Sequence, residues 1–350
     1  MIKRLVYQMV RYYCRFLARL FFGKVEILGQ ENIPKGQPVI YSSNHQNAFM
    51  DALIIGCLSP KTTYSVTRSD VFKKQFQWFM DAINMIPIYR IRDGFSQLAK
   101  NEETFRKIDA CLSQGHALTV FSEGNHGNDF FLRNVSKGSA RMALEAQEKM
   151  DHLDLQIIPL GLNYFHHQRP LHKISVVYGK SIHVKDFLPQ YLEHNAKGVN
   201  QMKEVIEQGM RTCLLIPTDG PTYQLQRGLI NRHNESPSFD QLREGIPLGE
   251  GLKSLGKPNK FLYGLGKFLG IFNFGPLWLL QSILSGIKDL VFYGSMKWAM
   301  AMFIFPIWFL LVLGVSSLLI DIQAGLIITL TSILMLYLRQ YLIKWSNIPH

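Results

Sequence analysis

The chain has 350 residues, a net charge of +12 and 47% hydrophobic residues. Its length allows one substantial core plus an appended segment, and the positive charge favours an anionic partner. The sequence has no zinc-finger spacing, basic leucine zipper or aromatic RNA-binding signature, so no nucleic acid is expected and the apolar tail favours lipid. Its four cysteines form no CxxC pair, which indicates thiols in a reducing compartment.

Residues 3–22 predict an amphipathic helix. Arg4, Arg11, Arg15 and Arg19 share one side, and the other side is apolar, with Leu5, Val6, Met9, Val10, Phe16, Leu17 and Leu20. One interpretation is a helix that caps the domain with solvated arginines. We favour a helix that lies on an anionic membrane, because a membrane tail follows elsewhere in the chain. The arginines interrupt the apolar run, so no cleavable signal peptide is expected.

Residues 38–182 alternate short apolar runs with helical patterns, which predicts an α/β domain: a mixed, largely parallel sheet flanked by helices. A further helix is expected at about 198–216, ending before Pro217. The predicted strands are 38–43, 62–67, 84–90, 116–122, 156–164 and 174–182, and the predicted helices are 51–58, 70–82, 96–113 and 137–149.

The last third of the chain predicts a linker followed by membrane segments. Residues 218–260 are polar and rich in Gly, Pro and charge, which indicates a linker or loose excursion. Residues 268–287 lack charge but contain interrupting polar residues, so we expect an interfacial or re-entrant segment.

A transmembrane hairpin is expected after this segment. Residues 299–320 are uncharged and long enough to cross a hydrocarbon layer of about 30 Å. Residues 324–338 are shorter and reach across if Arg339 snorkels. Lys297, Arg339 and Lys344 flank the hairpin and place both its ends in the cytoplasm. Two buried core helices would be the alternative, which the apolarity of the segments disfavours.

The segment from Asn44 to Asp51 carries the first chemical signal. A neutral imidazole held by a carboxylate takes a proton from a hydroxyl, as acyl transfer to an alcohol requires. Residues six apart on one helix point about 120° away from each other. His45 and Asp51 therefore meet only if His45 lies in a turn and Asp51 in the first helical turn. Taken alone, the pair also fits a surface turn with a carboxylate at a helix N-terminus.

Three further segments follow in order: Ile86–Arg90 (IPIYR), Val120–Gly124 (VFSEG) and Ile157–Gly161 (IIPLG). With Asn44-His45 ahead of them, they resemble the motifs of the glycerolipid acyltransferase family, which includes lysophosphatidic acid and glycerol-3-phosphate acyltransferases. The resemblance covers roughly residues 25–215. On the predicted strands, His45, Arg90 and Glu123 fall at carboxyl ends, where such sheets form their ligand crevice.

The resemblance implies roles for the motif residues. His45 would be the general base and Asp51 would fix its tautomer and stabilise the imidazolium. Arg90 would bind the acceptor phosphate. Glu123 would contact acceptor hydroxyls or an ordering network, Gly124 would let the backbone approach closely, and Pro159 would shape the acyl-donor site.

Two departures from the family pattern affect these roles. Five residues separate His45 from Asp51, whereas the commonest family form has four. In this respect the chain resembles a subset of the family that has asparagine two positions after the histidine, as Asn47 is here. After Glu123-Gly124 the family usually has threonine and arginine, whereas this chain has Asn125 and His126. Arg133 and Lys137 are therefore the candidates for the missing cation.

Plainer interpretations remain for some of these residues. Arg90 would also fit a surface charge at a strand end, and Glu123 a carboxylate at a helix N-terminus. A metal at His166, His167 and His172 is not expected, because no carboxylate or cysteine stands at ligand spacing. A lipid hydrolase is disfavoured by the lack of a Gly-x-Ser-x-Gly elbow.

The expected protein is a membrane-bound O-acyltransferase that moves a fatty acyl group from a thioester to a lysophospholipid hydroxyl, most simply from lysophosphatidate to phosphatidate. Acyl-CoA or acyl carrier protein would be the co-substrate and membrane phospholipids the partners, with no bound cofactor or metal. The catalytic domain would lie on the cytoplasmic face of the cell membrane. A glycerol-3-phosphate or lyso-aminolipid acyltransferase and an inactive membrane scaffold are the alternatives.

These expectations divide the chain into four parts. Residues 1–24 form the membrane-surface helix and residues 25–217 the acyltransferase domain. Residues 218–296 form a linker with the interfacial segment, and residues 297–350 the transmembrane hairpin.

Overall fold

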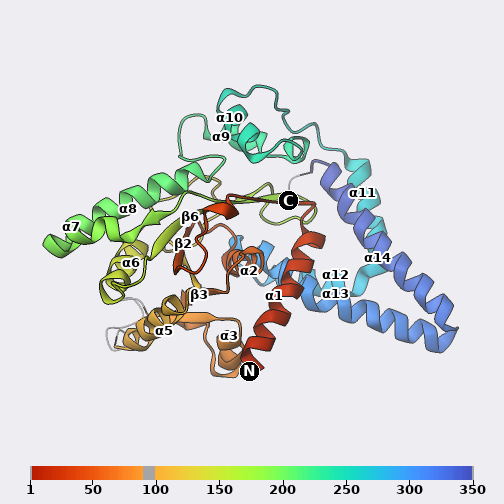
Figure 1. The fold of residues 1–350 in the computed structure, drawn as a ribbon. Coiled ribbons are helices and arrows are strands. Elements are labelled where there is room, and N and C mark those ends of the chain that lie inside the picture. Colours follow the sequence, from red (N-terminus) through yellow and green to blue (C-terminus); the bar gives the residue numbers. More distant parts are fainter. Residues whose placement is uncertain (1, 90–98, 349–350) are drawn as a thin grey trace.

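A computed structural model describes residues 2–89 and 99–348 (Figure 1). A mixed, largely parallel sheet forms its centre, as predicted, in the order β1-β7-β6-β2-β5-β3-β4, with β8 paired to β6. Only β7 and β8 run antiparallel to β6, and the other pairings are parallel. The strands are β1 (Lys24–Leu28), β2 (Val39–Ser43), β3 (Thr63–Arg68), β4 (Met85–Ile88), β5 (Ala117–Phe121), β6 (Gln156–Tyr164), β7 (Lys173–Tyr178) and β8 (Ile182–His183).

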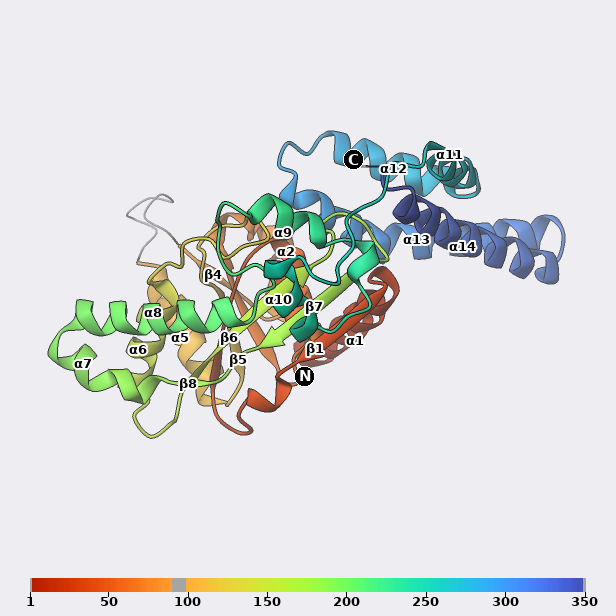
Figure 2. The ribbon, with the colours of Figure 1, turned by 90° about the horizontal axis from the view of Figure 1, so that it is seen from above.

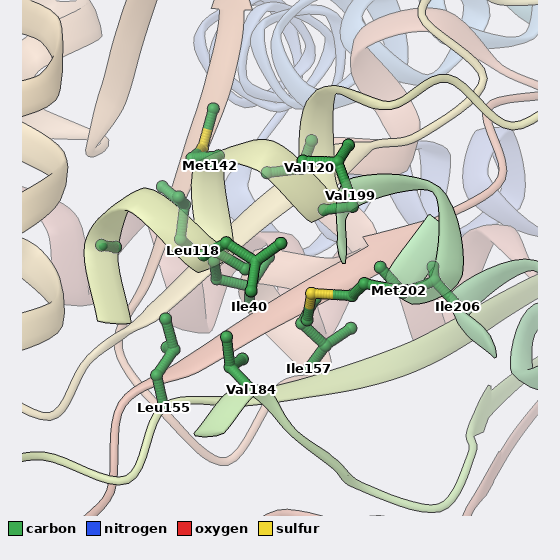
Figure 3. Close-up of a cluster of buried hydrophobic side chains, with 14 of the residues drawn as sticks. Ile40, Leu118, Val120, Met142, Leu155, Ile157, Val184, Val199, Met202 and Ile206 are labelled. Atoms are coloured by element: carbon green, nitrogen blue, oxygen red, sulfur yellow. The ribbon is translucent and has the colours of Figure 1, made fainter. Parts of the chain in front are cut away.

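Helices cover both faces of the sheet. On one face lie α5 (Asn101–Ser113), α6 (Gly138–Lys149) and α8 (Asn195–Thr212), whose side chains meet those of the strands in the cluster drawn in Figure 3. On the other lie α1 (Ile2–Phe21) and α2 (Ala48–Leu58). Every residue of β2 and β6 is buried, because a central strand covered on both faces has no solvent side.

The remaining short elements connect these layers. They are η1 (Gln30–Asn32), η2 (Ser69–Val71), η3 (Lys74–Phe76), α3 (Gln77–Ala82), η5 (Val184–Phe187) and α7 (Leu188–Glu193). The helix expected at 70–82 is thus broken into two 3-10 turns and α3, a segment that leaves Phe76, Trp78 and Phe79 exposed. Without burial of its apolar residues the segment lacks the packing that stabilises a longer helix.

The segment 218–260 is more ordered than its composition suggests. It contains α9 (Tyr223–Leu229), η6 (Arg232–Asn234) and α10 (Phe239–Leu248). Ser238 and Gln241 form a capping box at the start of α10. Phe239, Leu242 and Ile246 of this helix join a buried cluster against β7, so the expectation of a loose excursion is wrong for these residues.

The C-terminal helices project from the domain on the side opposite α7 (Figures 1 and 2). They are α11 (Lys260–Leu269), η7 (Gly270–Asn273), α12 (Phe274–Ser285), α13 (Val291–Leu319) and α14 (Ile322–Trp345). Three helical segments, Lys260–Ser285, Val291–Leu319 and Ile322–Trp345, are long and apolar enough to cross a membrane. The first overlaps residues 268–287, the segment expected to be interfacial, and that placement stays a prediction.

Helix α1 turns part of its basic side inward. Arg11 donates to the Ser59 carbonyl and Arg15 Nε to the Cys57 carbonyl at 2.8 Å, at the C-terminal end of α2. The last carbonyls of a helix lack partners and form its negative end, so they attract cations. The exposed apolar residues of α1 are Ile2, Leu5, Met9, Tyr12, Phe16 and Leu20. Arg11 and Arg15 are therefore held by the domain and are not the solvated arginines of the capping interpretation.

Candidate active site

His45 and Asp51 meet in the turn between β2 and α2. His45 Nδ1 lies 2.8 Å from Asp51 Oδ2, and the Asp51 side chain is fully buried. The same Oδ2 accepts the amides of Gln46 and Asn47, each at 2.8 Å. Asp51 Oδ1 accepts the Tyr164 hydroxyl at 2.6 Å. Two backbone amides and the Tyr164 hydroxyl therefore donate to this carboxyl group, which acts as the acceptor of the turn.

These contacts favour one tautomer of the His45 imidazole. Since Oδ2 of Asp51 already accepts two backbone amides, its contact with His45 is satisfied when Nδ1 carries the proton and Nε2 presents its lone pair. Burial, with Asp51 alongside, raises the pKa of Tyr164 well above its usual value, so this hydroxyl remains a donor. The His45 ring stacks on Phe121 at 4.0 Å between centroids and retains 16% exposure of its side chain. The group can therefore act as a base toward a hydroxyl that reaches Nε2.

The backbone of the turn is held in a strained conformation. Ala48 has a φ of +44°, in the left-handed region that a residue with a Cβ rarely adopts. On the strand side, Asn44 pairs through its amide with both backbone groups of Leu162 in β6. The turn is thus fixed to the sheet before it and to α2 after it, with His45 between them.

Glu123 and Arg133 tie this turn to the loop after β5. Glu123 Oε2 accepts the His45 amide at 2.9 Å, and Oε1 accepts the Arg133 amide at 2.9 Å. The Arg133 guanidinium lies 2.8 Å from Glu123 Oε2 and also donates to Asn125 and to the carbonyls of His126 and His45. These contacts favour the ordering role for Glu123 and give Arg133 protein partners in place of a substrate phosphate.

The remaining predicted site residues are Gly124, Lys137, Pro159 and Arg90, and among the described residues no hydrogen bond joins the first three to this network. Gly124 has a φ of +73°, which explains a glycine at this turn, and a Cβ there would meet nothing within 4 Å. Lys137 is exposed at the N-terminus of α6. Pro159 is buried in β6 beside Ser42, where the antiparallel partner changes from β8 to β7 and a missing N–H is tolerated. Arg90 lies outside the described residues.

A second histidine, His126, stands next to His45. The ring centroids are 5.7 Å apart, and His126 Nε2 lies 3.1 Å from Asp289 Oδ2, just before α13. The ring also meets Phe292 edge-on at 4.9 Å. Sequence reasoning noted His126 only as a departure from the family motif. The contact with Asp289 joins residues 163 apart, and no local pattern indicates it.

Helix α13 also contacts the turn itself. Ser295 Oγ donates to the Asn47 carbonyl and accepts the Met50 amide at 3.2 Å. Asn47 Nδ2 donates to the His167 carbonyl at 2.7 Å, which fixes the turn to the β6–β7 loop. Tyr164, Ser295 and His167 were not predicted to support the site, because their contacts depend on tertiary packing alone.

The three histidines of the β6–β7 loop have partners of their own. His167 Nε2 lies 3.1 Å from Gln46 Oε1, and His172 Nδ1 lies 2.7 Å from Glu235 Oε1. Burial lowers the pKa of His167 to about 3 and also lowers the pKa values of His166 and His172. Within residues 2–89 and 99–348, no group of three His, Cys, Asp or Glu side chains is arranged to hold a metal.

Part of the chain is similar to known acyltransferases. The family model Acyltransferase matches residues 24–163. Glycerol-3-phosphate O-acyltransferase 1 of Saccharomyces cerevisiae is 25% identical over 34% of this chain, and a 1-acyl-sn-glycerol-3-phosphate acyltransferase of Chlamydomonas reinhardtii is 27% identical over 40%. The matched segments span 16% and 39% of those proteins.

A solved structure, the 1-acyl-sn-glycerophosphate acyltransferase PlsC of Thermotoga maritima, aligns over 60% of this chain and 80% of its own, with 19% identity and a TM-score of 0.44. The residues that match the family model include His45, Asp51, Glu123 and Arg133, which build the network described above. Residues 24–163 of the chain therefore match the Acyltransferase family model, and the curated proteins to which this segment is similar are glycerolipid acyltransferases.

Proposed function

We propose that the protein is a membrane-bound O-acyltransferase that transfers a fatty acyl group from a thioester to the hydroxyl of a lysophospholipid, with lysophosphatidate as acceptor and phosphatidate as product. The observation that carries this proposal is the His45–Asp51 pair, with Nδ1 held at 2.8 Å and Nε2 available as a base. Acyl-CoA or acyl carrier protein serves as donor, and no bound cofactor takes part in the reaction.

In the proposed mechanism the acceptor alcohol attacks the thioester carbonyl directly. His45 Nε2 takes the hydroxyl proton, and the imidazolium then gives it to the leaving thiolate. Asp51 stabilises the imidazolium between these steps. Direct attack needs no cysteine nucleophile, and burial raises the pKa of Cys14 and Cys57 to about 12 and that of Cys213 to about 11. Such thiols stay protonated and unreactive at neutral pH.

The substrate contacts are less direct. Arg90 and Lys137 remain candidates for the acceptor phosphate, Gly124 for close backbone approach and Pro159 for the acyl-donor site. Because Arg133 is bound to Glu123, we assign it to positioning.

The membrane placement is part of the proposal. Helices α13 and α14 cross the membrane as a hairpin, with the catalytic domain on the cytoplasmic face of the cell membrane. The exposed apolar residues of α1 and the neighbouring Phe76, Trp78 and Phe79 rest on the same surface. This arrangement keeps the active site close to the lipids on which it acts.

Glycerol 3-phosphate is the second candidate acceptor. The yeast protein that matches residues of this domain is named for that activity, so the acceptor must be tested. A lyso-aminolipid is a further alternative, since the family arginine after Glu123-Gly124 is absent.

The test is an acyl-transfer assay on purified membranes with labelled oleoyl-CoA and a panel of acceptors: lysophosphatidate, glycerol 3-phosphate, other lysophospholipids and a lyso-aminolipid. Transfer to lysophosphatidate should fall at least about 100-fold in His45→Ala. His152→Ala, at an exposed turn, is the matched control and should retain activity. Equal activity in a folded His45→Ala protein would contradict the mechanism. If oleoyl-CoA gives no transfer, acyl carrier protein is tested as donor.

A further inference from the structure

Three cations gather where the C-terminal helices meet the acyltransferase domain. Arg169 comes from the β6–β7 loop, Lys297 from the first turns of α13 and Arg339 from the last third of α14. Gly294, one helical turn before Lys297, packs against the His167 carbonyl of the same loop, and Arg169 donates to the Ile348 carbonyl just after α14. Lys297 lies within electrostatic range of both arginines, so their charges repel one another. None of the three belongs to residues 24–163, which match the family model. The cluster therefore combines parts of the chain outside that domain motif.

The cluster is largely shielded from solvent and lacks a counter-charge among the described residues. Arg169 is only 8% exposed, and Lys297 and Arg339 are partly buried. In residues 2–89 and 99–348, none of the three forms an ion pair with a carboxylate. Glu235, which lies beside the neighbouring His172, is engaged by His172 and Lys344. Burying like charges together is costly unless an anion compensates them.

Donor groups in the cluster are also unused. The Nε atoms of Arg169 and Arg339 are buried and have no hydrogen-bond partner within the described residues. Arg169 uses another nitrogen to donate to the Ile348 carbonyl. Unsatisfied guanidinium N–H groups are rare in folded proteins, and a phosphate is well suited to accept several of them.

The position of the cluster indicates where such an anion would come from. Lys297 lies near the beginning of α13 and Arg339 near the end of α14, so both are at the same end of the hairpin, where it joins the domain. If the hairpin crosses the membrane as proposed above, this end lies at the level of the lipid headgroups.

We infer that Arg169, Lys297 and Arg339 form a binding site for a phosphate group, supplied by a membrane phospholipid at the junction of the hairpin and the domain. The bound phosphate compensates the three charges and fixes α13 and α14 against the β6–β7 loop. That loop holds the His45 turn through the His167 carbonyl. The lipid would therefore stabilise the assembly that contains the active site.

The experiment uses the full chain in phosphate-free neutral detergent and measures thermal unfolding with and without phosphatidylglycerol. Wild-type protein should gain Tm on addition of this lipid, because the ligand binds only the folded state. In Arg169→Gln and Lys297→Gln the gain should shrink, with binding about tenfold weaker. Without lipid Lys297→Gln should unfold at a higher Tm than wild type, since one repelling charge is gone. Arg169→Gln also loses the hydrogen bond to the Ile348 carbonyl, so only its lipid-dependent gain is compared. Lys288→Gln, an exposed lysine just before α13, is the matched control.

The Tm difference between Lys297→Gln and wild type should thus be positive without lipid and smaller or negative with lipid. A residue with only a structural role would not show this change. A lower Tm for Lys297→Gln than for wild type both with and without lipid would overturn the inference, as would an equal lipid effect in wild type and the two variants. Inorganic phosphate is tested in parallel: stabilisation by this ion alone supports the phosphate chemistry and assigns it to a soluble source. The readout does not depend on acyl transfer, so failure of the proposed reaction leaves the result interpretable.

Discussion

Gly294 of α13 packs against the carbonyl of His167 so closely that a Cβ on Gly294 would lie 2.1 Å from that oxygen. It would also lie 2.5 Å from Asn47 Oδ1. Both neighbours belong to the structure that holds the His45 turn, since Asn47 donates to the His167 carbonyl. Helix α13 is therefore a wall of the candidate active site as well as a candidate membrane span.

Gly294→Ala should consequently impair activity and stability together. The added methyl group meets backbone and a buried amide, which cannot move aside cheaply, and overpacking of this kind costs about 1–3 kcal/mol. We expect a large loss of acyl transfer and a lower Tm, measured on the full chain in detergent or nanodiscs.

Gly314→Ala is the matched control, because a Cβ at Gly314 of the same helix meets nothing within 4 Å. Alanine there should leave activity unchanged. If the two variants behaved alike, the contact between α13 and the turn would have no bearing on catalysis.

The Tyr164 hydroxyl should support the catalytic pair through Asp51. Tyr164→Phe removes one of four donors to a buried carboxylate, and loss of such a supporting hydrogen bond costs about tenfold in activity. We expect kcat to fall by this factor while KM for the acceptor stays nearly constant, since Tyr164 is buried behind Asp51.

Tyr178→Phe provides the control for this change. Tyr178 is equally buried, and its hydroxyl has no partner within the described part of the chain. Its removal should not lower kcat. A Tyr164→Phe enzyme with unchanged kcat would show that the remaining donors suffice to hold Asp51.

The sequence predicts the sheet well because its central strands are continuous apolar runs. β1 escaped prediction because this strand of five residues at the sheet edge contains two charged residues. α10 escaped because its three buried residues stand among Pro, Gly and charged residues, although the capping box at Ser238 was available as a signal.

The candidate site likewise has a part that the sequence predicts and a part that it does not. The six-residue spacing of His45 and Asp51 has a local geometry, so the sequence indicates how the two meet. Tyr164 reaches Asp51 across 113 residues and Ser295 reaches Asn47 across 248. Such contacts follow from the packing of α13 and the order of strands in the sheet, which a single sequence does not specify.

Helix α1 should insert its apolar side into the membrane surface. A polarity-sensitive fluorophore is attached to the new cysteine of the Met9→Cys variant. Its emission maximum should shift to shorter wavelength when the protein is moved from lipid-free peptide discs into lipid nanodiscs. Met9 is 63% exposed, and the four native cysteines are buried, so labelling is selective. The exposed Glu31→Cys is the control and should show no shift. Equal responses at both positions would place α1 away from the lipid.

The buried histidines should make stability depend on pH. Burial lowers the pKa of His167 to about 3, whereas an unfolded histidine titrates near about 6.5. Between these values the unfolded chain binds the extra proton, so stability is complete above about pH 6.5 and falls as the pH decreases. The loss in the free energy of unfolding approaches about 1.4 kcal/mol per pH unit for each such histidine.

The measurement is Tm as a function of pH between about pH 5 and pH 7. The slope of Tm against pH should be smaller for His167→Gln than for wild type, while His152→Gln at an exposed turn keeps the wild-type slope. Identical slopes in all three proteins would mean that His167 accepts a proton without unfolding, which its contacts with Gln46 and Tyr164 oppose.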